Sequence, residues 1–187
     1  MNAALQPVVG RCDGRWRDRP YREVLKLRNG RQVLLRPIHR SDAGGLADFF
    51  SALSPRSRHS RFHGAVNRLP DDALRHLSTQ VAQRHVALVA VGHTDDGQPH
   101  LVAEARYVAD SDETGRAEFA LTVADAWQGL GLGRALLQRL AVHASMLGLL
   151  ELEGSVLAEN RPMLELLHQL GAHFSHRGGE VRATLAL

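Results

Sequence analysis

The chain has 187 residues, of which 44% are apolar and 23% are charged, and this composition is typical of a soluble globular domain with one hydrophobic core. The single cysteine, Cys12, excludes an intrachain disulfide, and the longest apolar run, residues 86–92, is far shorter than the roughly 20 residues of a membrane-spanning helix. Charged residues among the first twenty positions argue against a signal peptide, so we expect a cytoplasmic protein without a membrane segment.

The formal net charge of +3 is unevenly distributed along the chain. Residues 1–40 contain ten arginines or lysines and three acidic residues. The other 147 residues contain thirteen arginines or lysines and seventeen acidic residues. We interpret residues 1–20 as a flexible basic arm and residues 21–187 as a single domain. No Phe, Trp or Tyr other than Trp16 and Tyr21 accompanies the basic residues 1–40, so a solvated tail is favoured over binding of nucleic acid.

The domain is expected to begin with two paired strands. Residues 23–27 and 32–38 are rich in valine, leucine and isoleucine, and the Asn29-Gly30 pair between them is a strong signal for a tight hairpin turn. The pattern therefore predicts an antiparallel hairpin.

Three short helices are expected to follow the hairpin. Ser41 and Asp42 offer N-caps for the first, Pro55 stands at an early position of the second, and Asp71 opens the third. The apolar residues of the first helix recur at helical spacing: Leu46, Phe49, Phe50 and Leu53.

The second half of the chain alternates between strand and helix signals. Three strands, a helix, a strand, a helix closed by Gly171 and two final strands are expected at residues 85–92, 100–109, 116–123, 131–147, 149–157, 159–171, 172–177 and 180–187. This order predicts an α/β fold in which helices cover the faces of a mixed sheet.

A glycine-rich turn between a strand and a helix is the first candidate site. Gly129, Gly131 and Gly133 precede an apolar helical pattern, and Arg134 follows them. Unpaired N–H groups at a helix N-terminus bind phosphates, and glycine lets a ligand approach the backbone closely. The alternative is that the glycines let the helix pack tightly on the strand. Neither a P-loop nor a dinucleotide-binding fingerprint matches the spacing.

Three segments of the chain resemble the GNAT superfamily of acyltransferases. The stretch "LTVADAWQGLGLGRALLQRL" resembles its acetyl-CoA signature R/Q-x-x-G-x-G/A, with Gln128, Gly131 and Gly133 at the signature positions. Residues 158–172 resemble the superfamily's asparagine-containing helix that ends in Leu-Gly, and residues 33–64 resemble the start of the GNAT domains of bacterial protein lysine acetyltransferases. The resemblance implies a GNAT-type fold with a central mixed, mostly antiparallel sheet flanked by helices.

The resemblance also implies a site for acetyl-CoA as co-substrate, without a metal. The residues it assigns to the CoA pyrophosphate are Gln128, Gly129, Leu130, Gly131, Leu132, Gly133 and Arg134. The pantetheine arm would pair with Leu121, Thr122 and Val123, and Asn160 would hold the far end of that arm. Asn160 is equally suited to be a helix N-cap.

Glu118 is the candidate general base, because the resemblance puts it at the position of the catalytic glutamate of lysine-acetylating members. Deprotonating a lysine at pH 7 costs roughly 4.6 kcal/mol, which a base can help to overcome. The alternative is an edge carboxylate paired with Arg116 or Arg106, and Glu104 is the reserve base. The tyrosine that often serves as general acid is replaced by Leu167.

These observations predict an N-acetyltransferase that transfers an acetyl group from acetyl-CoA to a primary amine, with a protein lysine side chain as the best single choice of acceptor. A small-molecule amine acetyltransferase and a non-catalytic acyl-CoA-binding regulatory module are the alternatives. A homodimer is compatible with the sequence.

Overall fold

The structure is a computed structural model that describes residues 21–64, 66, 68–80, 84–94, 96–109, 115–177 and 180–187. The expected basic arm, residues 1–20, lies outside the described residues. None of the helices in the described ranges has the length and apolar character that crossing a membrane requires.

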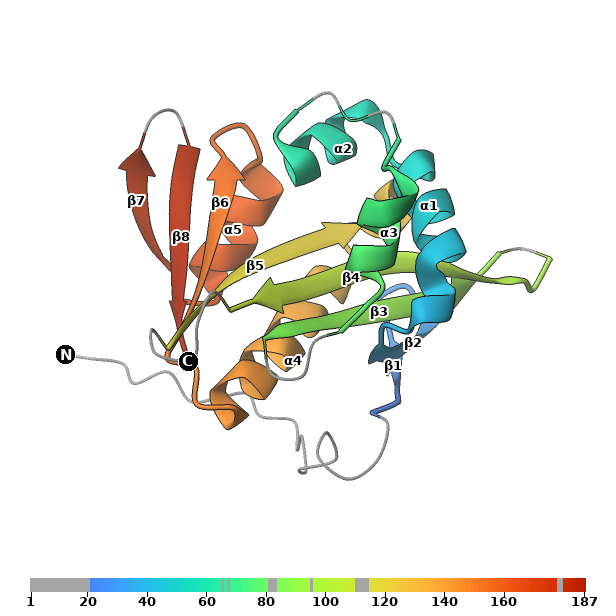
Figure 1. The fold of residues 1–187 in the computed structure, drawn as a ribbon, viewed down its shortest axis with the longest axis horizontal. Helices are drawn as coiled ribbons and strands as arrows, with labels where there is room; N and C mark the ends of the chain where they lie inside the picture. Colours follow the sequence, from blue (N-terminus) through green and yellow to red (C-terminus); the bar gives the residue numbers. More distant parts are fainter. Residues whose placement is uncertain are drawn as a thin grey trace.

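The described residues form an eight-stranded sheet in the order β1-β2-β3-β4-β5-β6-β8-β7 (Figure 1). Its strands are β1 (Glu23–Lys26), β2 (Gln32–Pro37), β3 (His85–His93), β4 (Pro99–Val108), β5 (Arg116–Val123), β6 (Glu151–Leu157), β7 (His173–Arg177) and β8 (Glu180–Ala186). Neighbouring strands are antiparallel except for β5 and β6, which are parallel. The mixed, mostly antiparallel sheet expected from the sequence is therefore confirmed.

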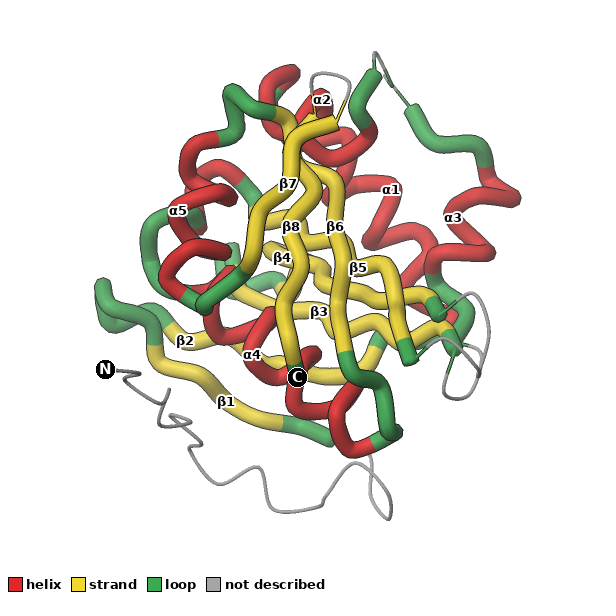
Figure 2. Tube along the Cα trace, turned by 90° about the vertical axis from the view of Figure 1, so that its left-hand side faces the viewer, coloured by secondary structure: helices red, strands yellow, loops and turns green. Residues whose placement is uncertain are grey.

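Helices cover both faces of this sheet. They are α1 (Ala43–Ala52), α2 (Pro55–Phe62), α3 (Asp71–Leu77), α4 (Leu132–Met146) and α5 (Arg161–Gln169), with short 3-10 turns η1 (Arg40–Asp42) and η2 (Asp125–Trp127). Figure 2 shows α1 and α3 on one side of the sheet and α4 and α5 on the other.

The continuous apolar run of β3, residues 86–92, follows from this layering, because both faces of the strand are buried. Leu88 and Ala90 join the core under α4, whereas Ala87 and Val89 join the smaller core under α1 and α3. A strand that is covered on both sides loses the polar alternation of a half-exposed strand.

Asp42 stands at the N-cap position of α1, as expected, but its side chain does not cap the helix. Asp42 has helical backbone angles, and its side chain makes no capping hydrogen bond to α1. Its carboxylate accepts a hydrogen bond from the His39 N–H at 2.7 Å and bonds the Arg36 guanidinium at 2.7 Å. The expected capping residues belong to the preceding turn η1. Helix α1 follows η1 directly and has no side-chain cap of its own.

Strands β5 and β6 pair only at their first residues, from Arg116 opposite Glu151 to Glu118 opposite Glu153. Beyond these pairs the two strands diverge (Figure 1). The Phe119 ring lies against Gly154 of β6, where a Cβ atom would come within 2.7 Å of the ring. The divergence leaves one edge of β5 without a partner strand in the middle of the sheet.

Candidate functional site

The open edge of β5 carries the backbone groups of Leu121 and Val123, of which the Val123 C=O accepts a hydrogen bond from the Gln128 side chain. The N–H of Ala124 donates to the C=O of Val102 on β4 at 2.9 Å. Because backbone groups alternate between the two sides of an antiparallel strand, Thr122 bonds toward β4, and Leu121 and Val123 face the diverging β6. Two of the three residues predicted to pair with pantetheine therefore offer backbone groups to the open side, and Thr122 does not.

A groove of about 420 Å³ runs along this open edge to the glycine-rich turn. Nine of the eleven predicted cofactor-binding residues line it: Leu121, Thr122, Val123, Gln128, Gly129, Gly131, Gly133, Arg134 and Asn160. The two others are directed to the protein interior, since the Leu132 side chain is 1% exposed and Leu130 packs against the same core.

The three glycines of the turn differ in backbone conformation and in their surroundings. Gly129 and Gly131 have φ angles of 72° and 89°, which side chains rarely adopt. A Cβ atom at Gly129 would meet no protein atom within 4 Å, and one at Gly131 only the Arg28 Nε at 3.8 Å. A Cβ atom at Gly133 would instead contact Leu121 and Leu166 at 3.4 and 3.5 Å. The backbone turn therefore explains Gly129 and Gly131, whereas the contacts of a Cβ atom at Gly133 would be ordinary van der Waals contacts.

The N-terminus of α4 opens onto this turn. Gly131 occupies the N-cap position of α4 and has no side chain to bond the first N–H groups of the helix. These N–H groups and the positive end of the helix dipole attract an anion. The turn therefore has the properties of a phosphate site.

Helix α2 forms the opposite wall of the groove and is tied to the segment before the turn. Asp125 accepts hydrogen bonds from the Ser54 N–H and hydroxyl at 2.9 and 2.8 Å, and from the Ser57 hydroxyl at 2.7 Å. The Gln128 amide donates to the Ser57 Oγ at 3.2 Å and to the Val123 C=O at 3.0 Å. The side chain of the signature glutamine thus fixes the walls of the groove to each other.

A second cavity of about 390 Å³ adjoins the groove. Both are lined by Ser60, Arg61, Leu121, Asn160 and Met163, so they meet beside the point where β5 and β6 diverge. Asn160 also caps α5, because its side chain accepts a hydrogen bond from the Met163 N–H at 3.3 Å. The capping role that the sequence allowed for Asn160 is confirmed.

Carboxylates stand on two walls of this second cavity. Glu118 projects from β5, and Glu180 begins β8, where its Oε1 lies 3.1 Å from the His63 Nδ1 at the end of α2. Glu118 is exposed, and the two arginines considered as its partners bond other carboxylates: Arg116 bonds Glu151 at 2.9 Å, and Arg106 bonds Glu104.

Glu104, the reserve base, is fully buried beneath the site. Its Oε1 bonds the Arg106 Nε, and its Oε2 lies 3.8 Å from the Arg61 Nη2. Arg106 also donates to the His85 Nε2 at 2.8 Å, and burial, followed by the charge of Arg106, lowers the pKa of His85 to about 4. These contacts indicate that Glu104 stabilises a buried charged network and does not contact an amine substrate.

Other side chains considered from the sequence lie away from this chemistry. Leu167, at the position of the family's tyrosine, is fully buried in the core. The part of the chain that the structure describes brings no three histidines, cysteines or acidic residues together as a metal site.

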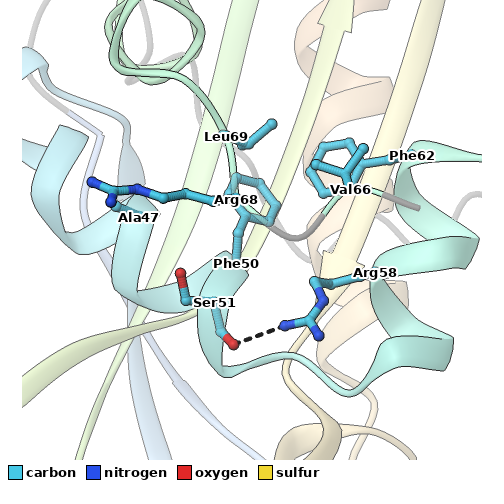
Figure 3. Close-up of a pocket in the computed structure, with 8 residues that line it drawn as sticks. All are labelled: Ala47, Phe50, Ser51, Arg58, Phe62, Val66, Arg68 and Leu69. Carbon is cyan, nitrogen blue, oxygen red and sulfur yellow. Dashed lines mark hydrogen bonds between the residues drawn. The ribbon is translucent and has the colours of Figure 1, made fainter. Parts of the chain in front are cut away.

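A third cavity, between α1 and α2, is too small for a substrate. It measures about 10 Å³, room for about one water molecule, and the Arg58 Nη1 donates to the Ser51 C=O beside it at 2.9 Å (Figure 3). The two larger cavities are therefore the candidate site.

Residues 32–173 match the family model of the acetyltransferase (GNAT) domain. The chain belongs to the GNAT family of acetyltransferases. Acetyltransferase PA5475 of Pseudomonas aeruginosa is 36% identical to this GNAT chain over 148 residues, which cover 79% of the chain and 78% of that relative.

Two further proteins are similar to this GNAT chain. Acetyltransferase Pat of Mycolicibacterium smegmatis is 29% identical over 149 residues, 79% of the chain, and the match spans only 43% of that longer relative. The crystal structure of the GNAT domain of PAT from S. lividans superposes with a TM-score of 0.81 at 27% identity, over 89% of this chain and 97% of that domain. The GNAT-type fold expected from the sequence is confirmed.

Several residues of the site could not be predicted from the sequence. Arg28 in the turn between β1 and β2, Ser57 and Arg61 in α2, and Glu180 in β8 all line one of the two cavities. No local motif marks these positions, because each reaches the site through the packing of a distant element.

Proposed function

We propose that this GNAT domain transfers an acetyl group from acetyl-CoA to a primary amine, with the side chain of a protein lysine as the acceptor. The observation that carries the proposal is the meeting of two cavities beside the unpaired edge of β5. One cavity leads to a turn suited to phosphates, and the other carries carboxylates on its walls. A thioester and an amine that enter from the two sides would meet at Leu121.

Acetyl-CoA fits the larger groove from the turn to the junction. Its pyrophosphate would lie on residues 129–134, where N–H groups of α4 and Arg134 face the groove. Its pantetheine amides would bond the backbone groups of Leu121 and the N–H of Val123 as an added strand does, since the Val123 C=O is already bonded to Gln128. Asn160, which borders both cavities, would contact the thioester end of this arm.

The chemistry assigns Glu118 the role of general base. Glu118 takes one proton from the ammonium group of the acceptor, the neutral amine nitrogen attacks the thioester carbonyl carbon, a C–N bond forms and the C–S bond breaks. The nitrogen releases its second proton to water. The CoA thiolate leaves and is protonated by water, because the buried Leu167 offers no acid. A base of this kind contributes about 10²–10⁴ to the rate.

An amine that is protonated in solution suits the acceptor cavity. Glu118 and Glu180 give its walls negative charge, which attracts an ammonium group before the proton is removed. The choice of a protein lysine is supported by the sequence resemblance to bacterial protein lysine acetyltransferases and by the similarity to the PAT domain.

The test is to incubate the full chain with acetyl-CoA and a panel of acceptors: lysine-containing proteins and peptides, free amino acids and polyamines. We expect mass spectrometry to find one added acetyl group on lysine side chains. Acetylation of the small amines alone would contradict the protein acceptor. A wild-type chain that binds acetyl-CoA but acetylates no amine would contradict catalysis and support an acyl-CoA-binding regulatory module.

A further inference from the structure

The turn between β1 and β2 packs against the glycine-rich turn, although it lies about 100 residues earlier in the sequence. The guanidinium carbon of Arg31 lies 3.5 Å from the centroid of the Trp127 ring. The Arg28 N–H donates to the Leu130 C=O at 3.5 Å. Contacts at both ends of the hairpin turn therefore fix it to residues 127–130.

Trp127 is held firmly enough to serve as the platform for this contact. Its side chain is 4% exposed, and its ring fills the space above Gly92, where a Cβ atom would come within 2.6 Å. A cation stacked on an indole ring gains roughly 0.5–1 kcal/mol at an exposed site and more when it is desolvated. Arg31 thus joins the hairpin to a rigid part of the fold.

The Arg28 side chain is directed by this packing to the N-terminus of α4. Its Nε is the nearest protein atom to a Cβ atom built on Gly131, at 3.8 Å, and Arg28 lines the 420 Å³ groove. Among the other arginines of the groove, Arg134 donates to the Gln169 Oε1 and Arg61 faces Glu104, whereas Arg56 stands on α2, in the opposite wall. Arg28 has no carboxylate partner within the described ranges of the chain.

We propose that Arg28 binds the pyrophosphate of acetyl-CoA and that Arg31 positions it by stacking on Trp127. The inference rests on the proposed function, which places the pyrophosphate on residues 129–134. A guanidinium group can donate two parallel hydrogen bonds to a phosphate, and it adds positive charge to that of the helix dipole. The hairpin thereby completes a phosphate site that the signature sequence supplies only in part.

Three ligands distinguish the phosphate that Arg28 contacts: CoA, dephospho-CoA, which lacks the 3′-phosphate, and S-acetylpantetheine, which lacks every phosphate. We expect calorimetry to show that Arg28→Ala weakens binding of CoA and of dephospho-CoA by the same factor, about ten- to hundredfold. Binding of S-acetylpantetheine is expected to be unchanged. Arg28→Lys should recover part of the affinity, because lysine supplies the charge without the paired hydrogen bonds.

Arg22→Ala is the matched control, because Arg22 is exposed beside β1 and does not line the groove. It should leave all three affinities unchanged. Three results would overturn the inference: Arg28→Ala binds CoA as tightly as the wild type, it loses affinity for CoA but not for dephospho-CoA, or its affinity for S-acetylpantetheine falls by the same factor. A wild-type chain that binds none of the three ligands would instead contradict the proposed function.

A double-mutant cycle tests the positioning role of Arg31. Arg31→Ala should weaken CoA binding in the wild-type background and have little further effect in the Arg28→Ala background, because Arg31 acts through Arg28. Equal losses in the two backgrounds would overturn this role, since they would show that Arg31 acts independently.

Discussion

Asp125 and Ser54 are 71 positions apart, yet one carboxylate accepts both the backbone N–H and the hydroxyl of the serine, at 2.9 and 2.8 Å. Ser54 is the N-cap of α2, and Asp125 begins the turn that leads to Gln128. The contact fixes the start of α2 above the groove. The wall that carries Ser60 and Arg61 therefore depends on a bond made near the cofactor signature.

This contact predicts a pH-dependent contribution to stability. Burial raises the pKa of Asp125, but hydrogen bonds from Ser54 and Ser57 outweigh it, and the pKa lies below its usual range. A lowered pKa adds stability above the unfolded value of about 4, and the gain is lost as the pH falls through the folded value.

Asp125→Asn should thus unfold at lower urea concentration than the wild type at pH 7, and the difference should shrink at pH 3.5. Asp48→Asn, at an exposed position of α1, is the control and should leave the urea concentration of unfolding unchanged at both pH values. A difference that is the same at both pH values would contradict a role for the ionised carboxylate.

Glu118→Gln tests the proposed base. The variant should keep its affinity for acetyl-CoA and lose about 10²–10⁴ in turnover at pH 7, because glutamine cannot accept the amine proton. The defect should diminish as the pH rises, since more of the amine then arrives neutral. Steady-state rates from pH 7 to pH 9.5 check this trend, and a defect that is constant across the range would instead indicate that Glu118 positions the substrate.

Glu104→Gln should behave differently, although both glutamates lie on the same face of the sheet. Removing the buried charge leaves Arg106 and Arg61 facing a neutral group, and breaking a buried ion pair costs about 3–5 kcal/mol of unfolding free energy. Chemical unfolding measures this loss. If Glu104→Gln is as stable as the wild type but shows the pH-dependent defect described above, Glu104 is the base.

Two substitutions of Gly131 separate backbone strain from blocked binding. Asparagine tolerates a φ of 89° better than most residues, so Gly131→Asn and Gly131→Asp should both fold. CoA at a hundred times its Kd should stabilise the wild type by about 2.7 kcal/mol. Gly131→Asp should lose this thermal stabilisation, because its carboxylate repels phosphate and pairs with Arg28, whereas Gly131→Asn should keep part of it. Equal behaviour of the two variants would show that charge is not the cause.

The lowered pKa of His85 predicts how the stability of the fold changes at acidic pH. Burial and the neighbouring Arg106 lower the pKa of His85 to about 4, so the folded protein holds this imidazole neutral at a pH where the unfolded chain protonates it. Its contribution to stability is complete above about pH 6.5 and decreases as the pH falls toward 4. In His85→Gln, the amide oxygen can accept the Arg106 hydrogen bond without titrating. Melting temperatures of the variant should therefore fall less than those of the wild type between pH 7 and pH 4.5, and parallel curves would contradict the assignment.

Much of the fold and part of the site could be predicted from the sequence, because the signals involved are local. Alternating or continuous apolar runs mark the strands, and the glycines before α4 mark a turn that only residues tolerant of positive φ adopt. The same signals placed Asp42 at the N-cap position of α1 but could not show that its carboxylate bonds His39 and Arg36 and not the helix.

Tertiary packing decided which residues meet at the site. The divergence of β5 from β6 after Glu118 opens the edge of Leu121 and Val123, and it depends on strand pairing between segments more than 30 residues apart. The stacking of Arg31 on Trp127 brings Arg28 to Gly131 from the start of the domain. Hydrophobic periodicity determines the element that each segment forms, but the contacts between elements depend on side-chain shape and charge across the whole chain, which no local pattern contains.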